Sequence, residues 1–403
     1  MSGTRRHIAL FIYGLAGGGA QRRTVTLANG FAARGHRVDL VVVHAGGVPA
    51  QAPSPAVRVV ALAGPGIRAL RAAGRWVNLR GLATASSTWP LARYLRRERP
   101  EVLLSAASHV NLVAVWARRL SGVPVPLVLR ASNHPSGNLF RWPATQRPIR
   151  WALQAGASRI YPWADAVVAV SQGVARQVVD LTGVSPERVT PIYNPVVDGE
   201  LLAKSRQPVG HPWVRSPGAP VILGVGTLKL QKDFPTLVRA FARVRAHRPA
   251  RLVILGEGRE RGALEHLAAS LGVARDVCLP GYTPNPFAWM ARAAVFVLSS
   301  AWEGLPGALV EAMACGCPVV STDCPDGPAE ILDGGRYGPL VPVGDDRALA
   351  EAIEGVLDAP PDRDGLRRRA AELCSVEPAV DRYLEVLEAA IAARHPAPRQ
   401  AAT

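Results

Sequence analysis

The sequence is poor in cysteine, in lysine and in long apolar runs. Five cysteines among 403 residues are too few for a disulfide framework, so we interpret them as reduced thiols of a cytoplasmic protein. A long uncharged stretch, residues 102–117, contains two serines, a histidine and an asparagine, and falls short of the roughly 18 apolar residues that a membrane-spanning helix needs. Hydrophobic residues still make up 48% of the chain, which predicts a globular protein large enough for two domains.

Acidic residues are scarce in the first half of the chain. Residues 1–200 contain 24 arginines and 8 acids, whereas residues 201–403 contain 23 basic and 23 acidic residues, so the net charge of +16 belongs to the first half. Arginines and tryptophans interleave in residues 66–100 and 140–154. Such a surface suits anionic lipid headgroups, a polyanionic substrate or nucleic acid. Generic use of arginine as the surface cation is the alternative, because the chain has 44 arginines and only 3 lysines.

Short apolar runs alternate with helical patterns along the chain. Several runs are apolar on both faces, which is typical of buried parallel strands. The alternation predicts an α/β fold with doubly wound sheets and right-handed crossovers. The predicted strands are residues 8–13, 38–43, 57–62, 101–105, 126–130, 166–170, 221–226, 251–256, 276–281, 294–300 and 318–322. Because the first of them continues this pattern and is followed by Gly14 and Gly17, we interpret it as part of the fold and not as a secretion signal.

A stretch rich in Pro and Gly interrupts the pattern once. We predict a first domain over 1–195, a linker over 196–218 and a second domain over 219–378. A helix over 379–395 is expected to cross back and pack on the first domain, and residues 396–403 to form a mobile tail. Within the second domain, a helix over 233–246 is expected to be capped by Asp233, with Pro235 in its first turn.

Ligands of doubly wound folds bind beyond the carboxyl ends of the strands, so the loops there are the candidate sites. Gly17, Gly18 and Gly19 precede a helix and let backbone amides approach an anion, although a tight turn explains them equally well. The dinucleotide fingerprint is not met, because Arg22 occupies the third glycine position and His44, not an acid, ends the second strand.

Two loops of the second half are further candidates. Gly224 and Gly226 end a strand and are followed by Lys229 and Lys232, two of only three lysines, which suits a phosphate ligand or else two solvated lysines. After another predicted strand, Tyr282 lies where it could contact a flat base or form a plain turn.

The stretch "EGLPGALVEAMACGCPVV" places Glu303 and Glu311 eight positions apart around a helix start. Pro306 suits the first turn and Gly316 the stop, so Glu303 lies before the helix and Glu311 on its body. The amides of residues 307–310 lie near the positive end of the helix, which offers donors for a diphosphate flanked by two acceptors for hydroxyls.

The cysteines and a D-x-D pattern raise the question of a metal. Cys315, Cys317 and Cys324 supply three thiols with no histidine nearby, short of the four ligands of a structural zinc, so we predict no metal site. Asp362 and Asp364 lie among charged residues far from the other motifs and are interpreted as solvated.

With these motifs the sequence resembles the retaining glycosyltransferases of family 4, which have the GT-B architecture of two facing Rossmann-like domains. The resemblance spans roughly residues 8–375 and rests on the glutamate pair and on three blocks in the family's order: "GGGAQRRTVTLANGFAARGHRVDLVVV", "GTLKLQKDFPTLVRAF" and "GALVEAMACGCPVVSTDCPDGPAEIL".

The resemblance implies a role for individual residues. Glu311 would bind the ribose hydroxyls, Glu303 the hydroxyls of the donor sugar and Lys232 the diphosphate. The family often has an arginine where Thr227 stands, and Lys229 is the candidate to replace that charge. The implied donor-binding residues are Gly17, Gly18, Gly226, Thr227, Lys229, Lys232, Tyr282, Glu303, Leu309, Val310 and Glu311.

Other residues are implied at the reacting centre and on the acceptor side. In relatives a histidine near His109 touches the donor sugar or the reacting centre, so Glu303, Lys232 and His109 are the candidate catalytic residues; a structural histidine is equally common at such a place. Arg130, Asn133 and His134 follow a strand and are expected to line the acceptor side.

The implied reaction moves a sugar, with retained configuration and without a metal or other cofactor, from a nucleotide-diphosphate sugar, expected to be UDP-linked. The expected acceptor is a glycolipid, a lipid-linked sugar or a polysaccharide of the cell envelope or exopolysaccharide. The expected partners also include an anionic membrane surface at the inner face of the cytoplasmic membrane, and no nucleic acid. A nucleotide-sugar epimerase of the same fold and an Arg-rich nucleic-acid-binding protein are the alternatives.

Overall fold

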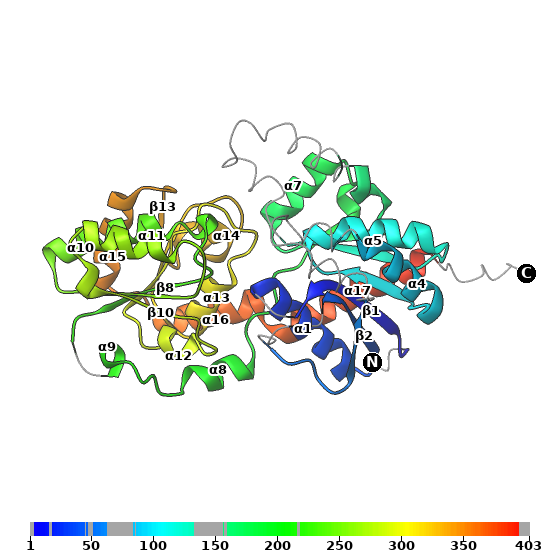
Figure 1. Ribbon diagram of the computed structural model, residues 1–403, viewed down its shortest axis with the longest axis horizontal. Coiled ribbons are helices and arrows are strands. Elements are labelled where there is room, and N and C mark those ends of the chain that lie inside the picture. The colour runs from blue at the N-terminus through cyan, green and yellow to red at the C-terminus, as the bar shows by residue number, and fades with distance from the viewer. Residues whose placement is uncertain are drawn as a thin grey trace, which may run out of the picture. The chain divides into compact units, whose positions relative to one another are not determined.

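The computed structural model describes residues 4–15, 18–44, 46, 51–62, 84, 86–132, 156, 159–215 and 218–394. The chain separates into two compact units. The first unit is formed by Met1–Pro195 together with Val376–Thr403, and the second by Val196–Ser375. Each unit contains one parallel β-sheet with helices packed against it (Figure 1). The predicted α/β class with two doubly wound sheets is confirmed.

The first unit has a seven-stranded sheet in the order β3-β2-β1-β4-β5-β6-β7. Its strands are β1 (His7–Gly14), β2 (Arg37–His44), β3 (Val57–Ala61), β4 (Val102–Ser105), β5 (Leu127–Ala131), β6 (Ala166–Ala169) and β7 (Val189–Pro191). Its described helices are α1 (Gly19–Ala33), α4 (Thr88–Glu98), α5 (Ser108–Ser121), η2 (Tyr161–Trp163), α7 (Gln172–Thr182), η3 (Pro186–Arg188) and α17 (Val376–Arg394).

The second unit has a six-stranded sheet in the order β10-β9-β8-β11-β12-β13. Its strands are β8 (Val221–Val225), β9 (Arg251–Leu255), β10 (Val277–Gly281), β11 (Val295–Leu298), β12 (Val319–Thr322) and β13 (Leu340–Val341). Its described helices are α8 (Gly199–Ser205), α9 (Pro212–Arg215), η4 (Leu230–Lys232), α10 (Phe234–His247), α11 (Arg261–Ser270), η5 (Ala274–Asp276), α12 (Phe287–Met290), α13 (Gly307–Ala314), α14 (Pro328–Ile331), η6 (Asp333–Gly335), α15 (Asp346–Asp358) and α16 (Arg363–Cys374).

All eleven apolar runs form strands, and two edge strands escaped prediction. β7 has three residues and β13 has two, which is too short for a run of apolar residues to stand out. Pro235 lies in the first turn of α10 as predicted. Asp233 takes the N-cap position in a left-handed conformation, but its side chain makes no capping hydrogen bond, so the predicted cap is wrong in that respect. No helix among the described residues is long and apolar enough to cross a membrane.

The predicted linker over 196–218 belongs to the second unit. It carries α8 and α9, and the Asn285 side chain donates a hydrogen bond to the Lys204 carbonyl oxygen at 2.9 Å. This segment therefore packs on the second unit and is not a free linker. Helices of seven and four residues are too short to give the repeated apolar spacing by which longer helices are recognised.

The last helix, α17, belongs to the first unit, and it begins three residues earlier than the predicted range. Its apolar side packs into the core cluster that also holds Ile8, Leu27 and Phe31. Helix α1 approaches it closely, since a Cβ on Gly30 would lie 2.5 Å from the Val380 side chain. The predicted tail after it lies outside the described residues.

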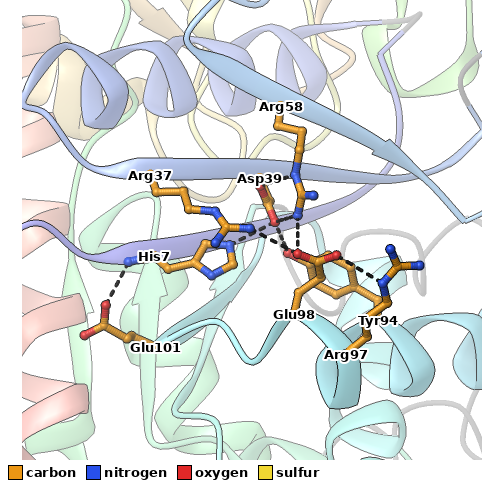
Figure 2. A network of polar contacts seen from close by, with 8 residues as sticks. All are labelled: His7, Arg37, Asp39, Arg58, Tyr94, Arg97, Glu98 and Glu101. Carbon is orange, nitrogen blue, oxygen red and sulfur yellow. Dashed lines mark hydrogen bonds and ion pairs between the residues drawn. The ribbon is translucent and has the colours of Figure 1, made fainter.

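A buried carboxylate joins three strands and a helix at the amino end of the first sheet (Figure 2). Asp39 of β2 is fully buried and lies 2.9 Å from the His7 ring nitrogen. Tyr94 of α4 donates to it at 2.6 Å and Arg58 of β3 at 2.8 Å. Arg58 also pairs with Glu98 at 2.7 Å. Burial opposes ionisation, but the hydrogen bonds from His7, Arg58 and Tyr94 outweigh it and hold the pKa of Asp39 well below its usual range.

Candidate active site

An ion pair lies beyond the carboxyl ends of the central strands of the second sheet. The Lys232 ammonium is 2.6 Å from one carboxylate oxygen of Glu303, and the two side chains are only 15% and 9% exposed. Lys232 ends η4 after β8, and Glu303 lies in the loop between β11 and α13. The topology brings these loops together, because β8 and β11 are neighbours in the sheet.

Polar side chains hold the carboxylate of this pair and its loop in place. Ser300 donates to Glu303 at 2.7 Å, and the Gln231 amide lies 3.4 Å from its other oxygen. Gln231 also donates to the Trp302 carbonyl at 2.9 Å, and Thr322 of β12 donates to the Ser300 carbonyl at 2.6 Å. A carboxylate with this many donors keeps one orientation, which is what recognition of sugar hydroxyls requires.

Glycine residues at the ends of neighbouring strands lie beside the ion pair. Gly226 follows β8 and donates its amide to Leu255 at 2.9 Å, and Gly256 follows β9 and donates to Gly281 at 2.8 Å. A Cβ on Gly226 would lie 3.0 Å from the Lys232 side chain, and one on Gly256 would lie 2.0 Å from the Gly226 carbonyl oxygen. The loops after β8, β9 and β10 therefore pack backbone against backbone.

This packing predicts that Gly256→Ala destabilises the second unit. Gly256 has φ +145 and no room for a Cβ, so we expect a loss of roughly 1–3 kcal/mol in the free energy of unfolding. Thermal unfolding measures the change. Gly262→Ala on α11 is the control, because a Cβ there meets no atom within 4 Å and should stabilise the helix slightly. Equal unfolding temperatures for the two variants would contradict the assignment of a backbone contact to Gly256.

Lys229 places a second ammonium near Lys232, as the sequence suggested. Lys229 is exposed, yet nearby protein atoms desolvate its ammonium in part, and this desolvation, together with the Lys232 charge, lowers the pKa of Lys229. Thr227, two positions earlier, is exposed. Two cations and one carboxylate leave this edge of the unit with a positive excess that suits a phosphate.

Helix α13 lies where the sequence predicted, from Gly307 to Ala314, with Gly316 at φ +73 ending it. Glu303 precedes the helix, and Glu311 lies on its body with a side chain that is 8% exposed. By helix geometry the amides of Gly307 and Ala308 have no carbonyl partner within the helix.

The predicted direct role of Leu309 and Val310 needs correction. Their side chains are fully buried, and their amides donate to the Pro306 carbonyl oxygen at 3.1 and 3.4 Å. The first turn thus uses these two donors itself, and the amides at positions 307 and 308 are the ones that helix geometry leaves without an intrahelical acceptor.

Tyr282 follows β10 and is 67% exposed. Beside it, the Glu257 carboxylate forms an ion pair with Arg261 at 2.8 Å. The carboxylate also packs closely on Gly281, since a Cβ added to that glycine would lie 2.6 Å from a Glu257 oxygen. Arg261 also donates to the Leu279 carbonyl at 2.9 Å, which ties the loop after β9 to β10. The structure thus presents an exposed aromatic ring beside a fixed acid–arginine pair.

The cysteines pack in the interior. Burial raises the pKa values of Cys315, Cys317 and Cys324 to about 12, so their thiols are protonated at neutral pH. Among the described residues, no three His, Cys, Asp or Glu side chains lie close enough together to hold a metal ion. Asp362 accepts hydrogen bonds from the Asp364 and Gly365 amides and caps α16.

Several predicted residues of the first unit fall outside the described part of the chain. These are Gly17, Asn133 and His134. Gly18 is the N-cap of α1, and a Cβ built on it meets no atom within 4 Å. His109 is the second residue of α5, directly after the carboxyl end of β4, and its side chain is not described.

Arg130 does not line a surface, so its predicted contact with an acceptor is wrong. The side chain is 1% exposed and donates to the Ala106 carbonyl at 3.2 Å and to the Asn194 side-chain oxygen. The guanidinium therefore holds the loop after β4 against the residues that follow β7, within the first unit.

The sequence analysis did not predict the residues that support the ion pair, nor any residue of the loop after β9. Ser300 and Gln231 adjoin predicted residues, and their position beside a strand end was the available signal. In "GEGRE", the glycines directly follow a buried strand, and a Cβ on Gly258 would lie 2.2 Å from the Leu228 carbonyl oxygen. The same signal had marked the loop after β8.

Two family models match the chain, one in each half. The model described as "Glycosyltransferase Family 4" matches residues 17–199, and that described as "Glycosyl transferases group 1" matches residues 219–359. The chain belongs to the GT-B glycosyltransferases. The positions of Lys232, Glu303 and Glu311 all lie within the second match.

Curated relatives of this GT-B glycosyltransferase act in lipid-linked and lipopolysaccharide synthesis. The N-acetylgalactosamine-N,N'-diacetylbacillosaminyl-diphospho-undecaprenol 4-alpha-N-acetylgalactosaminyltransferase of Campylobacter jejuni is 26% identical over 351 residues, 87% of this chain and 90% of that protein. The lipopolysaccharide core biosynthesis glycosyltransferase LpsE of Rhizobium meliloti is 34% identical over 227 residues, 55% of this chain and 64% of that protein.

Solved structures confirm the GT-B fold. The sucrose-phosphate synthase of Thermosynechococcus elongatus superposes with a TM-score of 0.80 at 21% identity, over 96% of this chain and 100% of that one. Anabaena HepE in complex with UDP-glucose gives 0.73 at 19% identity, also over 96% and 100%. Identities this low show the fold alone.

Proposed function

We propose that this GT-B glycosyltransferase is a retaining, metal-independent enzyme that transfers a sugar from a UDP-linked donor to a lipid-linked, glycolipid or polysaccharide acceptor. The observation that carries the proposal is the Lys232–Glu303 pair at the carboxyl edge of the second sheet. It sets a cation for a diphosphate beside a fixed carboxylate for sugar hydroxyls, at the place where doubly wound folds bind their ligands.

Each part of the donor has a proposed partner in the second unit. Lys232, Lys229 and the first two amides of α13 stabilise the diphosphate and the negative charge that grows on it as it leaves. Glu303 accepts hydrogen bonds from the sugar hydroxyls, and Glu311 from the ribose. Tyr282, through its backbone, and the exposed face around it receive the base.

The proposed reaction uses these roles. The acceptor oxygen bonds to the anomeric carbon on the face from which the diphosphate leaves, the hydroxyl proton passes to the departing diphosphate, and the anomeric configuration is retained. Lys232 and the helix amides are fixed before the reaction begins, so they stabilise the leaving group without reorganisation. Three cationic or dipolar donors supply the charge that a divalent metal would otherwise provide, which supports a metal-independent mechanism.

The acceptor proposal draws on the relatives. The Campylobacter enzyme is named for an acceptor on diphospho-undecaprenol, and LpsE for the lipopolysaccharide core. Both names describe acceptors attached to lipid. We propose the same class for this chain, at the inner face of the cytoplasmic membrane, with the basic first unit facing anionic lipid and with no nucleic acid as partner.

Ligand-induced stabilisation tests the donor proposal. A UDP-sugar at about 100 times its dissociation constant should raise the free energy of unfolding by about 2.7 kcal/mol, a shift of roughly 5–10 °C for a unit of this size. The panel compares uridine, guanosine, adenosine and thymidine diphosphate sugars, each with EDTA or magnesium. We expect a shift with a UDP-sugar that EDTA leaves unchanged and that Glu311→Gln largely removes.

Other results from the same panel of nucleotide sugars would contradict the proposal. A shift that needs magnesium would refute metal independence, and a larger shift with another base would replace UDP. Donor incubated alone, followed by product analysis, should return no epimerised nucleotide sugar. Epimerisation in the absence of an acceptor would assign the site to a different reaction.

A further inference from the structure

Two neighbouring helices of the first unit expose large apolar side chains. On α4 and α5, Trp89, Leu112, Trp116 and Leu120 are 60%, 44%, 43% and 48% exposed. They are four of the ten large apolar side chains exposed among the described residues, on two short helices that pack side by side (Figure 1). Single exposed apolar residues are ordinary, but a group of this kind marks an interaction surface.

The spacing of these residues forms one stripe along each helix. On α4 the exposed stripe is Trp89, Arg93, Arg96 and Arg97, and on α5 it is Leu112, Trp116, Arg119 and Leu120. Positions four, seven and eight apart lie on the same side of a helix. The α4–α5 face therefore combines indole and leucine side chains with guanidinium groups.

Arginine contacts join the two stripes into one surface. Arg96 lies over the Trp89 ring at 5.1 Å and donates to the Leu120 carbonyl at 2.8 Å. Trp116 packs edge-to-face on Trp163 with ring centroids 5.6 Å apart, and Arg119 lies over Trp163 at 4.2 Å. The aromatic rings thus have defined orientations, held by neighbours that remain at the surface.

The charge of this surface has one sign. No acid occurs on α5, and the single acid of α4, Glu98, is 17% exposed and pairs with Arg58 and Arg37. Arg97 also lies 3.6 Å from Glu98 but is 82% exposed. Arg93, Arg96 and Arg119 face outward with no carboxylate among them on these stripes. An anionic partner neutralises them, and the indole and leucine side chains need an apolar phase next to those anions.

We propose that the α4–α5 face docks on the surface of a lipid bilayer containing anionic headgroups. Tryptophan is favoured at the membrane–water interface, leucine enters the acyl boundary, and arginine pairs with lipid phosphates while its stem covers apolar surface. Nucleic acid would use the arginines but would leave Leu112 and Leu120 against water. The inference names the face of the first unit that contacts the anionic lipid in the proposed function. It rests on that function only for the choice of a lipid-linked acceptor.

Flotation of the full chain with vesicles tests the proposal. Vesicles of phosphatidylcholine alone are compared with vesicles that contain 30 mol% phosphatidylglycerol, at about 0.15 M salt. We expect binding to the anionic vesicles. Arg93→Gln with Arg97→Gln should weaken it about 30-fold, roughly fivefold for each arginine near the surface. Trp89→Ser with Trp116→Ser should weaken binding to anionic vesicles even at low salt, where electrostatic attraction is strongest.

Matched variants on the second unit serve as controls. Arg259→Gln with Arg347→Gln removes the same charge from two exposed arginines, whose side chains are 76% and 79% exposed. Leu202→Ser with Leu271→Ser removes two exposed apolar side chains. Both controls should keep flotation within about twofold, which is the scatter expected for surface substitutions.

Several outcomes would overturn the proposal. Equal loss of flotation in the control and the face variants would assign binding to net charge, and unchanged flotation in the face variants would move the contact elsewhere. Capture of RNA or DNA with an affinity that the tryptophan variant leaves unchanged would favour a nucleic acid. The unfolding temperature of the first unit, measured by calorimetry, checks that each variant is folded. The donor-induced thermal shift of the second unit separates failure of this inference from failure of the donor proposal.

Discussion

Replacing Lys232 with methionine should lower the rate of nucleoside diphosphate release by about 10²–10³-fold. The methionine keeps most of the side-chain volume but removes the charge 2.6 Å from Glu303. The buried carboxylate of Glu303 then lacks its cation and repels the diphosphate. Binding of the free nucleoside diphosphate should weaken roughly 10–100-fold, which is the range for a charge-assisted hydrogen bond. Calorimetric titration and a release assay measure the two quantities.

Glu303→Gln should separate the two halves of the pair. The amide keeps a contact for Ser300 but releases the Lys232 ammonium, so binding of the free nucleoside diphosphate should be unchanged or tighter. Turnover of the nucleotide sugar should still fall roughly 10–100-fold, because the sugar hydroxyls lose a charged acceptor. Opposite effects on nucleotide binding in the two variants are the distinguishing result.

The third lysine of the chain provides the control. Lys204→Met on α8 removes the same group from a surface pair with Glu200 and should change neither quantity by more than about twofold. Nucleoside diphosphate binding that is unaffected in Lys232→Met would remove Lys232 from the donor site. Weaker binding in Glu303→Gln, equal to that in Lys232→Met, would mean that the pair acts only as a structural link.

The site could be predicted where local order places it. Glu303 and Lys232 each lie a few residues beyond a strand end, and that position could be predicted from the apolar pattern. Glu311 followed from the helix period. The ion pair itself joins residues 71 positions apart and depends on β8 and β11 being neighbours in the sheet.

The predictions failed on side-chain direction and on the use of donors. Arg130 lies at a strand end like Lys232, but its guanidinium turns inward to partners 24 and 64 positions away in the sequence, which its own position does not indicate. The amides of Leu309 and Val310 donate to the Pro306 carbonyl oxygen, three and four positions earlier, as the first turn of a helix requires. That assignment follows only once the residue at which α13 begins is known.

The largest stability effect should come from Asp39, at the opposite end of the first sheet from the strand termini that bind ligands. Asp39→Ala leaves the buried donors of His7 and Tyr94, and the half-exposed guanidinium of Arg58, without their shared acceptor (Figure 2). Removing one partner of a buried ionic network typically costs about 3–5 kcal/mol, because the remaining groups stay desolvated. Calorimetry of the full chain should show a lower unfolding temperature for the first unit, while the donor-induced stabilisation of the second unit persists.

The pH dependence identifies the carboxylate as the cause. The pKa of Asp39 is depressed in the folded protein, so its contribution is fully present above the pKa of the unfolded chain, about 3.9, and is lost as the pH falls below it. The wild-type protein should therefore lose stability more steeply than Asp39→Asn as the pH is lowered from about 5 toward 3. Asp381→Asn is the control, since that carboxylate is 58% exposed and its pair with Arg34 should contribute about 1 kcal/mol or less. Parallel acid profiles for wild type and Asp39→Asn would show that the hydrogen-bonded shape of this network, and not its buried charge, holds the amino end of the sheet together.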